Sequence, residues 1–220
     1  MATAELRTVD PHTATSAPGT LPPDAPGSGF PAHRLTIARY ERMVDQGIFG
    51  EDEPIFLWHG RLVGKMTTGP RHHSSSNKLL KRMDRLMPEG WRTEHETPLA
   101  LRDDTMPEPD IKVVRGVPED DEERVASVRD VALVVEVADS SLAVDSGEVW
   151  ETYAREGIPV YWIVNLPGRR IDVYSQPSGP ANPPRYAEHQ SYGPGDEVPL
   201  VIDGHTVGRI AVDNVLPRRN

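Results

Sequence analysis

The sequence predicts an α/β fold in which a mixed β-sheet is flanked by helices. Short apolar runs that are typical of strands alternate with segments of helical periodicity, and the central order is strand, strand, helix, strand, strand. The most apolar run, VALVVEV at 131–137, shows almost no alternation of apolar and polar residues. Such a run is typical of a strand that is buried on both faces. A sheet with helices on its faces accounts for both observations.

The length and composition indicate one domain with a terminal tail. A chain of 220 residues, 37% of them hydrophobic, is long enough for one sizeable core and marginal for two. Residues 1–30 are rich in Pro, Gly, Ala, Ser and Thr and have no apolar periodicity, so we expect a disordered tail. Residues 31–220 are then expected to form a single domain.

The composition also excludes several classes of site. Because the chain has no cysteine, it has no disulfide, no thiolate metal site and no cysteine nucleophile. The N-terminus lacks the basic and apolar regions of a signal peptide, and the longest apolar run, Val131 to Val135, is too short to span a bilayer. We therefore expect a soluble, cytoplasmic protein without a membrane partner.

The net charge restricts how the chain can bind nucleic acid. Non-specific DNA affinity comes mainly from Lys and Arg side chains that neutralise phosphates, whereas the formal net charge here is −10. A DNA-binding surface must therefore be local. The best candidate is a predicted amphipathic helix from His72 to Met87, because residues 71–92 carry six Lys or Arg against two acidic residues. An ordinary solvated helix face is the alternative interpretation.

The elements before this helix are predicted from periodicity and turn signals. Apolar residues at helical spacing predict a short helix from Leu35 to Gln46, which Gly47 would end. The apolar segments 55–58 and 61–66 flank the dipeptide His59-Gly60. This dipeptide favours a hairpin turn, because glycine accepts the dihedral angles that such turns require. We expect two antiparallel strands here.

The remaining elements follow the predicted basic helix. Strands are expected at 91–95, 98–101, 110–114, 131–137, 160–165 and 170–175. A helix with one buried stripe is expected from Asp145 to Glu156, because glycine and proline just beyond it supply stop signals. The last two strands should pair across a Leu-Pro-Gly turn. The C-terminal region should contain one or two short edge strands near Leu200 and Ile210.

Two acidic residues stand out against these strands. Asp110 begins one apolar strand and Glu136 lies near the end of the next, so pairing of the two strands would bring both carboxylates to one sheet edge. Two hard oxygen ligands suit Mg²⁺ or Mn²⁺, completed by water and substrate phosphate. The alternative is that Asp110 caps a loop and Glu136 points into solvent. Acidic residues are, however, depleted in strands, and buried charges need partners.

The order and spacing of several segments resemble one protein family. PEPDIKVV at 107–114, LVVEVADSSLAVD at 133–145 and YAREGIPVYWIVNLPGRRIDVY at 153–174 are similar to the Uma-two family of bacterial restriction-endonuclease-like proteins. RYERMVDQGIF at 39–49, HGRLVGKM at 59–66 and GPRHH at 69–73 match its opening pattern. The resemblance implies a restriction-endonuclease-like PD-(D/E)xK fold and metal-dependent cleavage of DNA. It also implies that Asp110 and Glu136 are metal-binding carboxylates, with Mg²⁺ or Mn²⁺ as the cofactor.

The sequence departs from the family pattern at two positions. The family usually has an acidic residue before the Leu of its first strand, where this chain has Phe56. The family's catalytic lysine lies on the helix after the Glu, in a pattern like Asp-x-x-x-Lys-x-x-x-Tyr, and that position holds Val149 here. The resemblance assigns this lysine to orienting the attacking water and stabilising charge on the phosphate. Losing a preorganised charge of this kind typically costs on the order of 10²–10³ in rate.

Two further residues are candidates for the site. Lys112 lies two residues after Asp110 on the same strand face and is the nearest candidate to replace the missing lysine, although an exposed strand lysine is equally consistent with the pattern. His72 matches a position that the family often fills with His, and it could contact phosphate. A helix-capping or partly buried histidine is the alternative. The predicted catalytic residues are therefore Asp110, Glu136, Lys112 and His72.

Two functions follow from this reading. The first is a Mg²⁺-dependent DNA endonuclease in which a metal-activated water attacks phosphorus and, by resemblance, a 5′ phosphate is produced. The second is a DNA-binding or regulatory module on the same scaffold, whose catalysis has decayed through Phe56 and Val149. Double-strand cleavage would ordinarily need two active sites, which favours a homodimer.

Overall fold

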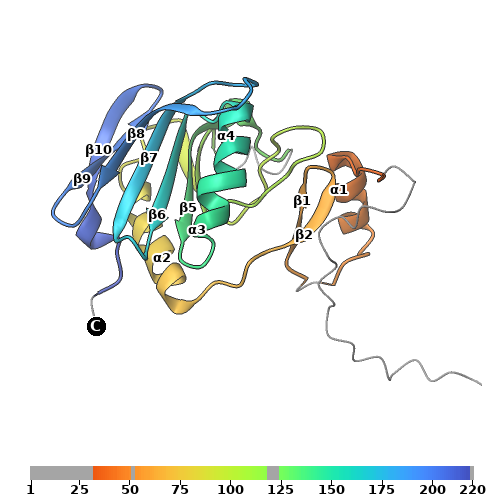
Figure 1. Ribbon diagram of the computed structural model, residues 1–220, viewed down its shortest axis with the longest axis horizontal. Helices are drawn as coiled ribbons and strands as arrows, with labels where there is room; N and C mark the ends of the chain where they lie inside the picture. The colour runs from red at the N-terminus through yellow and green to blue at the C-terminus, as the bar shows by residue number, and fades with distance from the viewer. Residues whose placement is uncertain (1–31, 51–52, 118–123, 219–220) are drawn as a thin grey trace, which may run out of the picture. The chain divides into compact units, whose positions relative to one another are not determined.

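A six-stranded mixed sheet is the centre of the computed structural model, which describes residues 32–50, 53–117 and 124–218 (Figure 1). In spatial order its strands are β3 (Trp91–His95), β4 (Ile111–Arg115), β5 (Val131–Ala138), β6 (Val160–Asn165), β7 (Arg170–Pro177) and β8 (Tyr186–Tyr192). β5 and β6 run parallel, and every other pair of neighbours in this sheet is antiparallel. The predicted mixed sheet and its central order of elements are confirmed.

A helical crossover connects the two parallel strands, as parallel pairing requires. It consists of the short helix α3 (Leu142–Val144), a π-helical turn (Asp145–Val149) and the helix α4 (Trp150–Glu156). Gly157 ends the crossover with a φ of 81°, in the left-handed region that favours glycine. The predicted helix from Asp145 to Glu156 is confirmed, and the helical segment begins slightly earlier, at Leu142.

The two faces of the sheet carry separate apolar cores. On one face, strand residues such as Val135 pack with α2 (Pro70–Asp84) and with a separate hairpin formed by β9 (Glu197–Ile202) and β10 (His205–Ala211). On the other face, residues such as Val134 pack with α4. Consecutive residues of β5 therefore face two different cores. This arrangement explains the unbroken apolar run that the sequence shows.

A small group of elements precedes α2. The strands β1 (Ile55–Trp58) and β2 (Arg61–Gly64) pair antiparallel. The two turn residues between them, His59 and Gly60, both have positive φ angles, 48° and 75°. A two-residue turn of this kind matches the twist of the paired strands. The helix α1 (Ile37–Asp45) packs against this hairpin in a third, smaller core. The predicted helix and hairpin are both confirmed.

The predicted and observed strands differ at three places. The predicted strand at 98–101 is wrong, because the segment makes only an isolated bridge from Ala100 to Ser127 and otherwise hydrogen-bonds to loops. The strand β8 is not predicted, because most of its side chains are exposed and it lacks apolar alternation. The expected strands near Leu200 and Ile210 are present as β9 and β10, but they pair with each other outside the main sheet.

The predicted tail at residues 1–30 lies outside the described residues. From Arg34 onward, the described residues form one compact unit. Within the described ranges, no helix is long and apolar enough to cross a membrane.

Candidate active site

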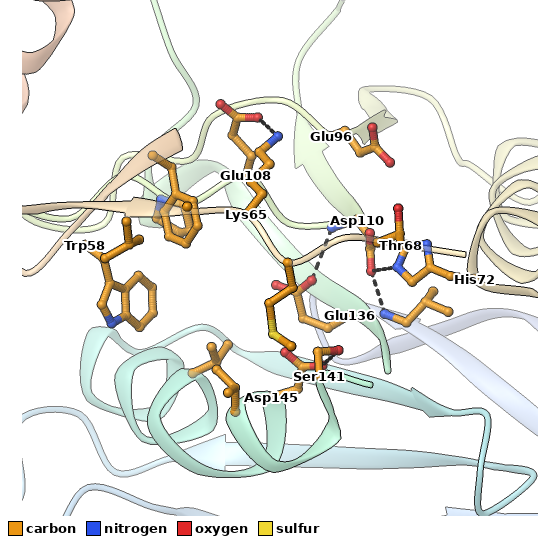
Figure 2. Close-up of a pocket in the computed structure, with 18 of the residues that line it drawn as sticks. Trp58, Lys65, Thr68, His72, Glu96, Glu108, Asp110, Glu136, Ser141 and Asp145 are labelled. Carbon is orange, nitrogen blue, oxygen red and sulfur yellow. Dashed lines mark hydrogen bonds and ion pairs between the residues drawn. The ribbon is translucent and has the colours of Figure 1, made fainter. Parts of the chain in front are cut away.

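The pairing of β4 with β5 brings the two predicted carboxylates together. Ile111 lies opposite Val135 in the antiparallel register, which places the residue before β4 beside the residue after Val135. The Asp110 amide accordingly donates a hydrogen bond to Glu136 Oε2 at 3.3 Å. The Val137 amide donates to Asp110 Oδ2 at 2.6 Å (Figure 2). The two acidic side chains therefore converge, as the strand pattern predicts.

Glu136 faces a cavity that Tyr153 of α4 also lines. Every other residue of β5 is buried, and Glu136 alone in this strand is partly exposed. The Tyr153 hydroxyl, which α4 supplies, donates to Glu136 Oε1 at 2.9 Å and fixes the orientation of the carboxylate. Burial, followed by the negative charges of Asp110 and Asp145, raises the pKa of Glu136 well above its usual value.

His72 connects α2 to this pair of carboxylates. Its side chain is almost fully buried, and its Nε2 lies 3.0 Å from Asp110 Oδ2. Burial lowers the pKa of His72, but the hydrogen bond and the charge of Asp110 outweigh it, so the net effect is a raised pKa. The second ring nitrogen, Nδ1, is buried and has no hydrogen-bond partner among the described residues. The structure thus brings His72, Asp110 and Glu136 together.

Asp145 adds a third carboxylate that the sequence reasoning did not select. It opens the π-helical turn of the crossover and is buried. The Ser141 hydroxyl donates to Asp145 Oδ2 at 2.5 Å. Burial raises the pKa of Asp145 to about 6; the Ser141 bond opposes this rise, and the charge of Asp110 adds to it. The available signal is the family pattern Asp-x-x-x-Lys-x-x-x-Tyr, whose first residue is Asp145 in this chain.

These side chains line one cavity of about 410 Å³. The two positions that depart from the family pattern, Phe56 and Val149, both belong to its wall. Six acidic residues also line the cavity: Glu96, Glu108, Asp110, Glu136, Asp145 and Glu148. Lys65, which directly follows β2, lines the same cavity. The site therefore combines an apolar wall with a strong excess of carboxylates.

The donor set fits a hard divalent cation that also uses water or substrate as ligands. Among the described residues, no three His, Asp or Glu side chains are close enough to hold a metal ion by themselves. Asp110 and Glu136 offer two converging carboxylates, and Mg²⁺ is commonly held by one or two carboxylates together with water and phosphate. The pKa of Glu136 is raised first by burial and then by the negative charges of Asp110 and Asp145. A bound cation would relieve this repulsion between the acids.

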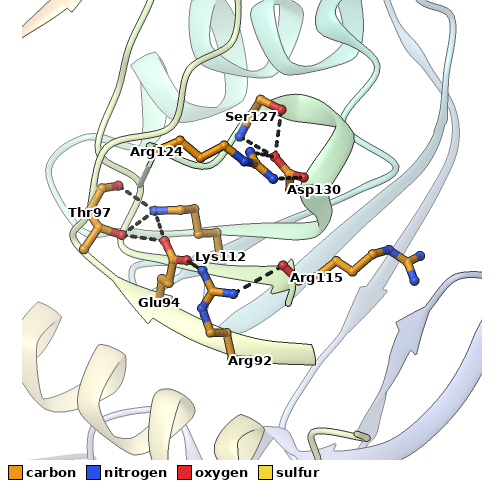
Figure 3. A network of polar contacts seen from close by, with 8 residues as sticks. All are labelled: Arg92, Glu94, Thr97, Lys112, Arg115, Arg124, Ser127 and Asp130. Carbon is orange, nitrogen blue, oxygen red and sulfur yellow. Dashed lines mark hydrogen bonds and ion pairs between the residues drawn. The ribbon is translucent and has the colours of Figure 1, made fainter. Parts of the chain in front are cut away.

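Lys112 is not brought to the three other predicted residues. Its side chain is completely buried, and its ammonium contacts Glu94 Oε2 at 2.7 Å (Figure 3). It also donates to the Thr97 carbonyl at 2.8 Å. Lys112 and Glu94 are direct cross-strand neighbours in β4 and β3, which turns the ammonium toward β3 and away from β5. Lys112 does not line the cavity that contains Asp110 and Glu136.

Comparisons with known proteins identify the family and the fold. The model of a family described as Uma2, putative restriction endonuclease, matches residues 37–206. The crystal structure of a putative nuclease belonging to DUF820 from Anabaena variabilis is similar, with a TM-score of 0.60 and 15% sequence identity. This similarity covers 82% of the present chain and 97% of the Anabaena chain, and it confirms the predicted fold class. No curated protein matches the sequence.

Proposed function

This chain belongs to the Uma2 family, and from that premise we propose that it is a metal-dependent endonuclease that hydrolyses phosphodiester bonds of DNA. The observation that carries the proposal is the convergence of Asp110 and Glu136 in a cavity at the start of β4. The proposed cofactor is Mg²⁺ or Mn²⁺, held by these two carboxylates. When bound, such an ion neutralises charge on a phosphate and lowers the pKa of a coordinated water.

The neighbouring side chains would hold these carboxylates in place. His72 Nε2 lies at hydrogen-bond distance, 3.0 Å, from Asp110 Oδ2, and the bond to Asp110 and its charge outweigh burial, so the pKa of the ring is raised. The Tyr153 hydroxyl donates to Glu136 and leaves Oε2 directed toward Asp110. Preorganised contacts of this kind reduce the reorganisation that a reaction otherwise requires. His72 is therefore assigned to positioning Asp110 and to supplying positive charge beside it.

The proposed DNA surface begins next to this cavity. The helix α2 starts at Pro70, a residue suited to the first turn of a helix, and carries His72 in that same turn. Arg71, Lys81 and Arg85, on or just after α2, are exposed. An acidic protein must rely on few such phosphate contacts, so DNA binding is expected to weaken steeply with salt. Two chains, each with one site, would cut both strands of a duplex, which makes a homodimer part of the proposal.

A second function is favoured by the apolar wall of the cavity. Phe56 and Val149 occupy positions where the family has an acidic residue and a lysine, and both line this cavity. The same scaffold could therefore bind DNA and a metal ion without cleaving the strand. The two functions differ in one observable. Both proteins would bind metal and DNA, but only the endonuclease would cleave the DNA strand.

Plasmid nicking tests the proposal directly. Purified protein is incubated with supercoiled plasmid and Mg²⁺ or Mn²⁺, and Asp110→Ala serves as the matched variant. We expect nicking by the wild type, loss of nicking in Asp110→Ala, and retained DNA binding by both proteins. A wild type that binds Mn²⁺ and retards plasmid but never nicks it would favour the non-catalytic module.

A further inference from the structure

The cavity has an unusual balance of charge for a site that accepts a phosphodiester. Six carboxylate side chains line it, whereas Lys65 is the one Lys or Arg side chain of the described chain that does so. A divalent cation held by two carboxylates would offset part of this negative charge. The incoming strand adds further negative charge at each phosphate. A second positive group is therefore needed beside the phosphate, and Lys65 is available for that role.

The other three lysines of the chain are engaged or lie elsewhere. The ammonium of Lys112 is buried against Glu94 and Thr97. Lys78 donates to the Leu216 carbonyl at 3.2 Å, and Lys81 is exposed on α2 outside the cavity. Their positions leave Lys65 as the lysine that can reach the carboxylates.

Backbone and side-chain contacts both fix the position of Lys65. Its amide donates to the Pro54 carbonyl at 2.6 Å, which closes the open end of the β1–β2 hairpin. Its ammonium forms an ion pair with Glu108, two residues before Asp110 (Figure 2). About a third of the Lys65 side chain (34%) remains exposed, against 0% for Lys112. The ammonium is thus held beside the segment that leads into β4 and is still accessible to a ligand.

We propose that Lys65 is a catalytic residue whose ammonium contacts a non-bridging oxygen of the scissile phosphate, with Glu108 as its positioning residue. This inference rests on the proposed nuclease function. In the reaction a water oxygen bonds to phosphorus and loses its proton to solvent, while the bond from phosphorus to the 3′ oxygen breaks and that oxygen gains a proton from water. Lys65 keeps its protons throughout and stabilises the charge that develops on the phosphate.

Two measurements on Lys65→Met and Lys65→Gln test the inference, with Arg61→Met as a control that removes one positive charge from the same hairpin outside the cavity. The first is the salt dependence of binding to a duplex oligonucleotide in Ca²⁺. Losing one phosphate contact should lower the slope of log affinity against log salt by about one. The second is nicking of supercoiled plasmid in Mg²⁺, which should fall on the order of 10²–10³-fold. Arg61→Met should change neither value.

Related variants and the alternative outcomes separate this inference from the proposed function. Lys65→Arg should retain the salt slope and part of the nicking, since the charge remains. Val149→Lys in the Lys65→Met protein should restore nicking, because position 149 lines the same cavity. An unchanged salt slope in Lys65→Met would overturn the inference, whether or not the wild type nicks DNA. A reduced slope with an inert wild type would support the phosphate contact and overturn the nuclease function.

Discussion

Two charged clusters are centred two residues apart, on Asp110 just before β4 and on Lys112 within β4, and they differ in how their charges are balanced. Asp110 at the start of β4 joins Glu136 and Asp145 in a cavity where burial and mutual repulsion raise the pKa of both partners (Figure 2). Lys112 joins Glu94, which also contacts Arg92 at 2.7 Å (Figure 3). Burial raises the pKa of Glu94. The hydrogen bond from Lys112 and the positive charge of Lys112 outweigh this effect, so the pKa of Glu94 is lowered overall.

This difference in charge balance distinguishes the cluster around Lys112, which joins strands, from the cavity that contains Asp110, which we propose as a ligand site. In the cluster around Lys112, each charge is already paired, and the paired groups join β3 to β4. In the cavity, the buried His72 contacts Asp110, but Glu136 and Asp145 form no ion pair with any described residue, so repulsion between the carboxylates destabilises the metal-free site. A cation that enters the cavity therefore gains interaction energy that it would not gain near Lys112. Strongly perturbed acids in a cavity are a general sign of a functional site.

The largest expected effect comes from breaking the balanced cluster. Lys112→Met would leave the Glu94 carboxylate without its main partner, and removing one member of a buried ion pair typically costs about 3–5 kcal/mol. Urea denaturation should show this loss, and the exposed Arg61→Met should change the free energy of unfolding by less than about 0.5 kcal/mol. A Lys112→Met protein of normal stability that has lost nicking would instead place Lys112 in the active site.

The next effect is a pH dependence caused by the unbalanced cavity. The pKa of Asp145 is raised from 3.8 to about 6 in the folded state, so its stabilising contribution is complete below the unfolded pKa and is lost as pH rises through the folded pKa. Between about pH 4.5 and about pH 7.5, Asp145→Asn should gain about 2 kcal/mol of stability relative to the wild type. Chemical denaturation of the metal-free proteins at both pH values measures this difference.

Bound metal should offset the loss of stability that the wild type shows as the pH rises. Mn²⁺ competes with protons for the carboxylates, so it should raise the melting temperature of the wild type more at neutral than at acidic pH. Equal melting shifts at both pH values, or equal Mn²⁺ affinity in wild type and Glu136→Gln by calorimetry, would contradict a metal site at Asp110 and Glu136.

The smallest effect compares the same chemical change in both clusters. Glu94→Gln removes the partner of a buried lysine and should destabilise the protein by about 1–3 kcal/mol. Glu136→Gln removes one of several repelling carboxylates and should stabilise the metal-free protein by about 1 kcal/mol at neutral pH. Thermal melts of the two variants in the presence of a chelator provide the test. Destabilisation by both substitutions would show that the cavity is as well balanced as the Lys112 cluster.

The sequence by itself determined the strands from β3 to β7 of the sheet and the convergence of Asp110 with Glu136. The strands from β4 to β7 and the crossover helix follow from local apolar patterns, and sequential strands usually pair. Once β4 and β5 pair, Asp110 and Glu136 must meet, because both lie at the same end of the pair. Local patterns were insufficient to predict strands at two segments, because neither has a distinctive periodicity. A strand was wrongly predicted at 98–101, and β8 was not predicted.

Only the tertiary structure decided which further side chains share the site. Asp145 reaches the carboxylates because the crossover packs on one sheet face. Lys65 lines the same cavity and pairs with Glu108, which lies two residues before Asp110. Lys112 lies two residues after Asp110 and therefore on the same face of the sheet, yet its ammonium turns to the cross-strand neighbour Glu94. Strand parity fixes the face of the sheet on which a side chain lies. The direction in which a long charged side chain extends from that face depends on the oppositely charged group on the neighbouring strand.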